Sequence, residues 1–372
     1  MKKIIILTII TFLMSGCSYV ELNDLAIVSA IGIDYENDEF KLTAQIMDVK
    51  SNDGGMTEEN TLIYEASGKT IAKAMRNFSV RYPKNVYLGH LEFIIINSDT
   101  TIKKIDDIFD YFMRSPEVRS LSYITLTKDE KAKDILNPKN ESKGSFPIEG
   151  LKTVLLDATK RNGTIYDLTL EELLSFYLKK GIDPVVPLIK SSNKKGMTAS
   201  ATIIEELAPL KNKKVLKSLD TKQSIAYNTI NNNYYDIVIN CKYKNKNFSA
   251  LLYNPKSSLD LKIKDGKPEV NINIKLESKI IETDNKINLT KSKNQKEIKK
   301  QVNKEIKKYI NSLIDYSKEN NADVLGLGNM IYKNYFKDYN KYKNKNVYEL
   351  AKFNIKIDNK MYRYGNINKG AV

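Results

Sequence analysis

Alternation of apolar and polar residues predicts a strand pair near the N-terminus. Leu25–Ile33 is an apolar run, and the apolar residues at 40, 42, 44 and 46 alternate with polar ones. Residues 36–39, which are acidic or Asn, lie between the two runs and predict a hairpin turn. The stretch Leu91–Ile96 is apolar enough for a central strand covered on both faces, and residues 123–127 predict a further strand.

Two helices are predicted between these strands. Ile71, Met75 and Phe78 lie on one helical face, which Pro83 ends, and a second apolar stripe runs from Ile102 to Phe112. The order strand, strand, helix, strand, helix, strand is typical of an α+β domain. We assign this domain to residues 17–130.

The next segment, residues 131–230, is predicted to form a middle α+β domain. Thr169 and Glu172 form a capping box before an apolar helical face, and Gly181 follows where a helix C-cap favours positive φ. A strand from residue 199 and a helix over residues 221–230 complete the segment.

The last segment, residues 231–372, has the clearest pattern. Alternating residues on both sides of Asp265–Gly266 predict an antiparallel hairpin with one solvated face. A long amphipathic helix runs from Ile298 to Leu313, a second helix starts near Ala322, and residues 353–357 read as a final strand. The predicted fold class is therefore α+β, with three small domains, each a mostly antiparallel or mixed β-sheet with surrounding α-helices.

The first residues have the pattern of an exported lipoprotein. Two lysines precede the apolar stretch Ile4–Met14, which is shorter than the roughly 20 residues of a membrane span. The stretch ends in Leu13-Met14-Ser15-Gly16-Cys17, which resembles a bacterial lipobox with Met14 in place of the usual leucine. We therefore expect residues 1–16 to be a signal peptide and Cys17 to carry the lipid, with palmitate among its acyl chains; a retained apolar anchor is the alternative.

Scarce residue types exclude several kinds of site. The 372 residues include one histidine, His90, and two cysteines, Cys17 and Cys241, so one chain cannot assemble a His/Cys zinc site. His90 precedes the predicted central strand, so we expect a packed, hydrogen-bonded ring, with catalysis or pH sensing as the alternative. Cys241 is expected to be a small apolar strand residue, and no cofactor is predicted.

The formal net charge of +15 would suit an anionic partner. Export makes nucleic acid improbable as that partner. The lysines along the helix after Lys291 form either a solvated surface or a phospholipid- or partner-binding patch. The acidic residues Asp34, Glu36, Asp38 and Glu39 raise the alternative of a calcium site, but they lack EF-hand spacing, which favours a solvated hairpin.

Five segments form a pattern whose order and spacing are more specific than any one of them. They are Glu21–Val28, Ile31–Asp34, Gly89-His90, Arg114–Arg119 and Ala322–Gly328. Together they resemble the Ger(x)C spore-germination lipoproteins, the C subunits of germinant receptors. The family commonly has Trp and an acidic residue soon after the lipid-bearing Cys and Trp near the C-terminal helices, where this chain has Ser18-Tyr19 and no Trp.

The resemblance implies a non-enzymatic protein of three small domains. It also implies lipid attachment to the outer face of the spore inner membrane, beside two membrane-embedded receptor subunits of the A and B types. The family supplies no settled ligand site, so none is carried over. Exposed polar residues near the family-like segments are our candidates for partner contact: Glu117, Arg119 and Asp323.

Two other function classes remain as alternatives. A solute-binding or wall-associated lipoprotein of a transport system would need long βαβ alternation, which the C-terminal segment lacks. A lipoprotein enzyme acting on murein would need a carboxylate pair or a metal triad, and one histidine does not supply the triad.

Overall fold

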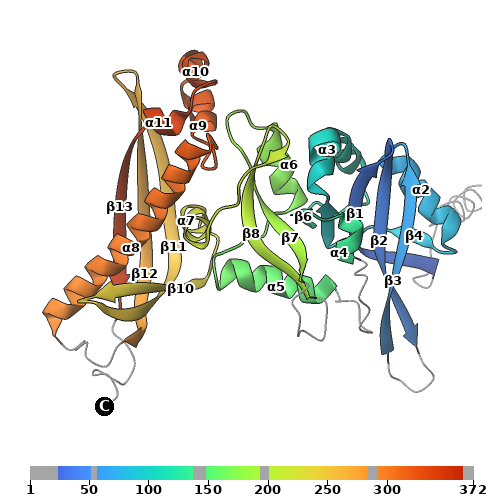
Figure 1. Ribbon diagram of the computed structural model, residues 1–372, viewed down its shortest axis with the longest axis horizontal. Helices are drawn as coiled ribbons and strands as arrows, with labels where there is room; N and C mark the ends of the chain where they lie inside the picture. The colour runs from blue at the N-terminus through green and yellow to red at the C-terminus, as the bar shows by residue number, and fades with distance from the viewer. Residues whose placement is uncertain (1–23, 52–56, 137–147, 193–200, 284–290, 363–372) are drawn as a thin grey trace, which may run out of the picture.

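The strands of the protein form two sheets flanked by helices (Figure 1). The computed structural model describes residues 24–51, 57–136, 148–192, 201–283 and 291–362. The predicted α+β class is confirmed. The expectation of one sheet in each of three domains is wrong for the described residues, because their strands make two sheets instead of three.

The first sheet has nine strands in the order β3-β2-β1-β5-β6-β7-β8-β9, with β4 paired to β1. The strands are β1 (Leu25–Glu36), β2 (Glu39–Ser51), β3 (Thr57–Gly68), β4 (Asn85–Tyr87), β5 (Phe93–Ile96), β6 (Tyr123–Thr127), β7 (Val185–Ser192), β8 (Ala201–Lys211) and β9 (Lys214–Val215). Its centre, β1-β5-β6-β7, is parallel and its outer pairs are antiparallel.

This sheet crosses the predicted domain boundary at residue 130. Strand β6 pairs with β7 in parallel through Leu126 and Leu188, which lie on opposite sides of that boundary. The pairing covers the edge of β6, where main-chain groups would otherwise lack partners inside the apolar core. The boundaries of the three segments stay predictions, but the first two share one sheet.

The second sheet has four strands in the order β10-β11-β12-β13. They are β10 (Asp236–Tyr243), β11 (Lys246–Lys264), β12 (Lys267–Thr283) and β13 (Lys352–Met361). The predicted hairpin is confirmed: Asp265 and Gly266 both have positive φ and join β11 to β12. Strand β13 closes the sheet parallel to β12.

Ten helices are described. They are α2 (Ile71–Arg81), α3 (Ser98–Arg114), α4 (Ala132–Leu136), α5 (Ile148–Lys160), α6 (Leu170–Leu178), α7 (Thr221–Ile230), α8 (Ser292–Glu319), α9 (Leu327–Asn334), α10 (Phe336–Tyr342) and α11 (Val347–Leu350). The capping box of Thr169 and Glu172 is present at α6. The helix expected near Ala322 begins instead at Leu327, because residues 322–326 form a loop.

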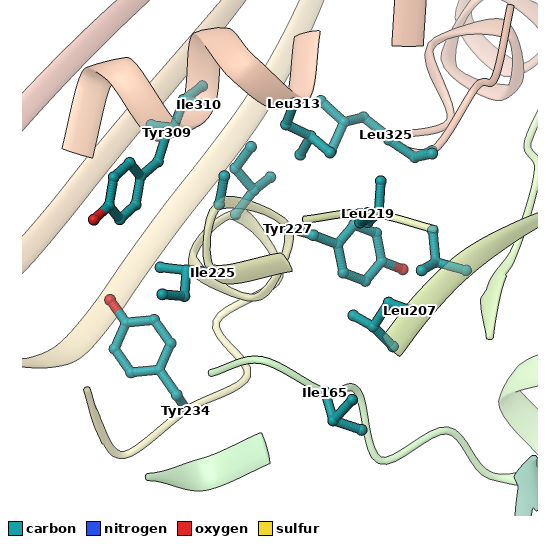
Figure 2. Packing of buried hydrophobic residues seen from close by; sticks show 14 of the residues in the cluster. Ile165, Leu207, Leu219, Ile225, Tyr227, Tyr234, Tyr309, Ile310, Leu313 and Leu325 are labelled. Atoms are coloured by element: carbon teal, nitrogen blue, oxygen red, sulfur yellow. The ribbon is translucent and has the colours of Figure 1, made fainter. Parts of the chain in front are cut away.

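Helix α7 joins the two sheets into one core. Every residue from Ser224 to Ile230 is buried, and Tyr227 packs among side chains of α8 and of the first sheet, Leu207 included (Figure 2). The amide nitrogen of Asn228 donates to the carbonyls of Gly163 at 2.8 Å and Ile165 at 3.0 Å. These hydrogen bonds satisfy a polar group that would be costly to bury alone.

The turn at residues 36–39 is confirmed, but the acidic group near it is not uniformly solvated. Asn37 and Asp38 have positive φ, as a tight hairpin requires. Asp34, in contrast, is buried, and its carboxylate accepts hydrogen bonds from the backbone N–H groups of Ala132 and Lys133, each at 3.0 Å. Asp34 therefore fixes the start of α4 against β1.

Replacing Asp34 by alanine should lower the free energy of unfolding by about 2 kcal/mol, because two buried N–H groups lose a charged acceptor. Urea unfolding followed by circular dichroism measures the loss. Asp110→Ala is the control, since Asp110 makes only an exposed ion pair with Arg114 and should cost at most about 0.5 kcal/mol. Equal losses in the two variants would contradict this role for Asp34.

Candidate functional site

Asp323 caps helix α9 from the preceding loop. Its Oδ1 accepts hydrogen bonds from the N–H of Leu327 at 2.8 Å and the hydroxyl of Tyr348 at 3.0 Å, and its Oδ2 accepts one from the N–H of Gly328 at 2.7 Å. A carboxylate at a helix N-terminus is favoured by the helix dipole. Asp323 is thus a structural cap, which the sequence alone left open beside a docking role.

The same loop is tied to the first sheet. The N–H of Asp323 donates to Oδ2 of Asp183 at 2.8 Å, and the N–H of Asp183 donates to the carbonyl of Asp323 at 3.0 Å. The N–H of Asn329 donates to the carbonyl of Gly181 at 2.6 Å. We call these contacts between residues 181–183 and 323–329 the joint.

Two glycines allow the joint to form. Gly181 has φ of +74°, and a Cβ atom there would lie 2.5 Å from the carbonyl carbon of Gly328. A Cβ on Gly328 would lie 3.0 Å from the Cα of Gly181. The two segments therefore approach at a separation that side chains would prevent, which accounts for glycine at positions 181 and 328.

Burial shifts the acidity of both joint carboxyls. It raises the pKa of Asp323 to about 6, although three hydrogen bonds to the carboxylate act in the opposite direction. Burial also raises the pKa of Asp183, although the nearby positive charge of Lys211 acts to lower it. The Lys211 ammonium lies 3.9 Å from Oδ2 of Asp183 and donates to the carbonyl of Asn321.

A cleft of about 660 Å³ opens beside the joint and is lined by both Asp183 and Asp323. Its lining includes four lysines: Lys211 and Lys213 at the turn from β8 to β9, and Lys343 and Lys345 in the segment after α10. Solvent protons can therefore reach the joint.

Glu117 and Arg119 lie apart from Asp323, on an exposed loop after α3. The loop is braced by the N–H of Val118, which donates to the carbonyl of Ser115 at 3.2 Å, and by the N–H of Ser122, which donates to the carbonyl of Arg119 at 3.0 Å. Its end is fixed to the start of α6, because the N–H of Glu171 donates to the carbonyl of Ser120 at 3.0 Å. Asp323 contacts the chain beyond the opposite end of α6, so the structure does not gather the three candidates into one site.

Apolar side chains flank this loop. Met113 at the end of α3 is 55% exposed and Leu121 is 54% exposed. Exposed apolar groups beside charged side chains of both signs are typical of a protein contact surface. We call residues 113–121 the α3 loop surface.

Several other expectations can now be assessed. His90 is exposed, with its ring centroid 5.9 Å from that of Tyr87, so the prediction of a packed histidine is wrong. It belongs to a turn before β5 instead of the strand itself. Cys241 is buried in β10, as expected, and burial raises its pKa to about 12. Cys17 lies outside the described residues.

The basic helix and the acidic hairpin show no built site. On α8, Lys300, Lys304, Lys307 and Lys308 are exposed. Within the residues that the structure describes, no group of three or more His, Cys, Asp or Glu side chains is arranged to hold a metal ion. Across the same ranges, none of the helices combines the length and apolar character that crossing a bilayer requires.

Sequence reasoning missed Asp183 and the partnership of Gly181 with Gly328. Both glycines and the capped helix α6 were visible as local signals. The contact itself joins residues 140 positions apart, and no local pattern reports such a separation.

Two family models together span most of the chain. Residues 18–191 match the model described as "Spore germination protein N-terminal domain", and residues 205–365 match "Spore germination B3/GerAC like, C-terminal". The chain belongs to the Ger(x)C family of spore germination proteins. The resemblance drawn from the sequence is confirmed.

Relatives and a solved structure agree with the family. Spore germination protein KC of Bacillus subtilis is 25% identical over 87% of this chain and 84% of its own length. GerQC of Bacillus cereus is 25% identical over 98% of this chain and 99% of its own. The crystal structure of the GerBC protein shares the fold, with a TM-score of 0.55 and 17% identity over 92% of this chain and 99% of that one.

These names support a role in spore germination, and none of the matched descriptions concerns transport or names an enzymatic activity.

The joint should make stability depend on pH between 5 and 7. The folded pKa of Asp323, about 6, lies above the ordinary aspartate pKa of 3.8, so between these values the folded protein binds more protons than the unfolded chain. The free energy of unfolding should therefore rise as pH falls from 7 to 5, by about 1 kcal/mol from this group. Urea unfolding at each pH measures it.

Asp323→Asn is the control, because it removes the titrating group while keeping its size. The variant should lose this part of the pH dependence, whatever its stability at one pH. A variant whose unfolding free energy changes with pH as steeply as that of the parent would disprove the assignment to Asp323.

Proposed function

We propose that this protein is a lipid-anchored subunit of a nutrient germinant receptor, required for spore germination and acting by docking to two membrane-embedded partner subunits. The observation that carries the proposal is the match to germination-family models from residue 18 to residue 365, across both sheets. The protein would lie on the outer face of the spore inner membrane.

The architecture suits a docking subunit. Two sheets share one core through α7, and the joint ties them again at residues 181–183 and 323–329. Surfaces on such a body keep fixed positions relative to one another, which lowers the entropic cost of binding. The buried groups with altered pKa values, Asp323 and Cys241 among them, serve as caps or core residues.

The α3 loop surface is our proposed partner contact. Met113 and Leu121 offer apolar area, and Glu117 and Arg119 offer a charge pattern that a partner can match. In protein interfaces, a few such residues dominate affinity and charges select the partner. Asp323 belongs to the joint, so its charge reversal would act first through folding.

Cys17→Ala should abolish lipid labelling of the protein, because this thiol is the proposed acylation site. The product should be either an unprocessed precursor or a protein released from the membrane, since stable anchoring needs the acyl chains. Metabolic labelling with a palmitate analogue measures it. Labelling that persists in this variant would reject the anchor.

Exchanging the charges of the α3 loop surface should weaken partner binding. The variant Glu117→Lys with Arg119→Glu keeps the net charge, so an expected loss of about tenfold in capture of the two membrane subunits would reflect the charge pattern. Germination of spores carrying the variant should be impaired in parallel.

The matched control exchanges an exposed pair elsewhere. Asp315 and Lys318 on α8 lie 3.7 Å apart, with side chains 62% and 39% exposed, and Asp315→Lys with Lys318→Asp should leave capture unchanged. Thermal melting verifies that both proteins fold. If the α8 exchange abolished capture and the α3 loop exchange did not, the docking surface would be on α8.

A further inference from the structure

Side chains of helices α9 and α10 form an aromatic cluster, and one of its rings, that of Phe336, is largely exposed to solvent. The ring of Tyr332 lies edge-on to Phe336 at 5.4 Å and to Tyr339 at 5.0 Å between centroids. Phe336 is nevertheless 66% exposed. Exposing this much apolar area to water is unfavourable unless something covers it.

Lysines surround the cluster. Between residues 327 and 350 the chain has five lysines against two acidic residues, Asp338 and Glu349. Lys333, Lys337, Lys343 and Lys345 are exposed and form no ion pair with another described residue, whereas Lys341 pairs with Asp338 at 2.6 Å. The aromatic cluster therefore sits in a region of positive potential.

The surface continues across the joint onto the end of α6. The ammonium of Lys180 lies 5.3 Å from the ring centroid of Tyr332. Two residues earlier, Leu178 is 69% exposed. Exposed apolar side chains and lysines thus come from two places, the end of α6 and the pair α9 and α10. Helix α10 projects at one edge of the molecule (Figure 1). We call Leu178, Lys180, Lys333, Phe336 and Lys337 the α10 tip.

We propose that the α10 tip is a second membrane contact, which binds the surface of a bilayer carrying anionic lipids. Phenylalanine and leucine enter the headgroup boundary while lysines pair with anionic headgroups, the combination found in interfacial protein segments. A polar partner surface would leave Phe336 and Leu178 poorly covered. Acyl chains at the N-terminus and the tip would together fix the orientation of the body on the membrane.

The lysines of α8 provide an internal comparison. That helix exposes more lysines, but none of its large apolar side chains is among the exposed ones in the described residues. Charge alone should give weak, salt-sensitive attraction. The tip differs by combining charge with apolar area, so its binding should retain a salt-resistant part.

The test uses residues 18–372, which lack Cys17 and lose no described helix or strand, because the first strand begins at Leu25. Co-sedimentation with phosphatidylcholine vesicles, with and without phosphatidylglycerol, measures the partition coefficient. We expect binding to the anionic vesicles only. The double variant Lys333→Glu with Lys337→Glu should lower the partition coefficient at least tenfold, at about fivefold for each lysine. Phe336→Ser should remove the part of the binding that persists at high salt.

Lys300→Glu with Lys307→Glu on α8 is the control with the same charge change, and it should lose less than the tip variant. An equal loss, or no binding of the parent protein to anionic vesicles, would overturn the proposal. Loss of partner-subunit capture by the tip variant with vesicle binding intact would also overturn it, in favour of a protein contact.

A second readout covers variants that fold poorly. Phe336→Cys gives one accessible thiol, because Cys241 is buried. An environment-sensitive dye there should shift to the blue with anionic vesicles, and the same dye at Lys300→Cys should not. Residues 18–372 lack Cys17, so a negative vesicle-binding result would not bear on the proposed lipid anchor. A negative result in the Cys17 labelling test would likewise not bear on the α10 tip.

Discussion

The structure depends on one helix that is buried on all sides. Helix α7 lies between α8 and the first sheet, and its residues from Ser224 to Ile230 contribute apolar area to both neighbours. A helix with no solvated face is stable only inside a core. The polar side chains it does contain must be satisfied internally, which Asn228 achieves through backbone carbonyls on the segment after α5. The two sheets therefore fold around α7 as one body.

The joint adds a second connection of a different kind. At α7 the contact is apolar and insensitive to pH, whereas Asp183 and Asp323 connect the sheets through hydrogen bonds to carboxylates whose pKa values burial raises. Gly181 and Gly328 approach so closely that a side chain at either position would clash with the opposite backbone. Two separated connections resist rotation of one sheet against the other, whereas a single connection would act as a pivot.

Local patterns in the sequence predicted what depends on local forces. The hairpin at Asp265–Gly266 follows from turn chemistry and the capping box of Thr169 from capping chemistry. Both are present, as is the predicted helix over residues 221–230. Pairing of β6 with β7 depends on which distant strand covers a buried edge, so three sheets were expected where two formed. Asp323 shows the same limit: its polarity was visible, but its three hydrogen-bond donors were not.

Amino-acid composition and net charge do not locate the binding surfaces of this protein. Lysine is spread along the whole chain, so the net charge of +15 marks no site. The position of the lysines is more informative. On α8 they flank a buried apolar stripe, with no large exposed apolar side chain among the described residues of that helix, whereas near Phe336 they surround apolar area that the fold leaves uncovered. The α3 loop surface combines charge and apolar area differently, because it carries one acidic and one basic side chain, Glu117 and Arg119, between Met113 and Leu121. A mixed-charge surface discriminates between protein partners, while a uniformly basic one with apolar tips favours a lipid surface. The proposed partner contact and the proposed lipid contact are therefore chemically distinct surfaces of one body.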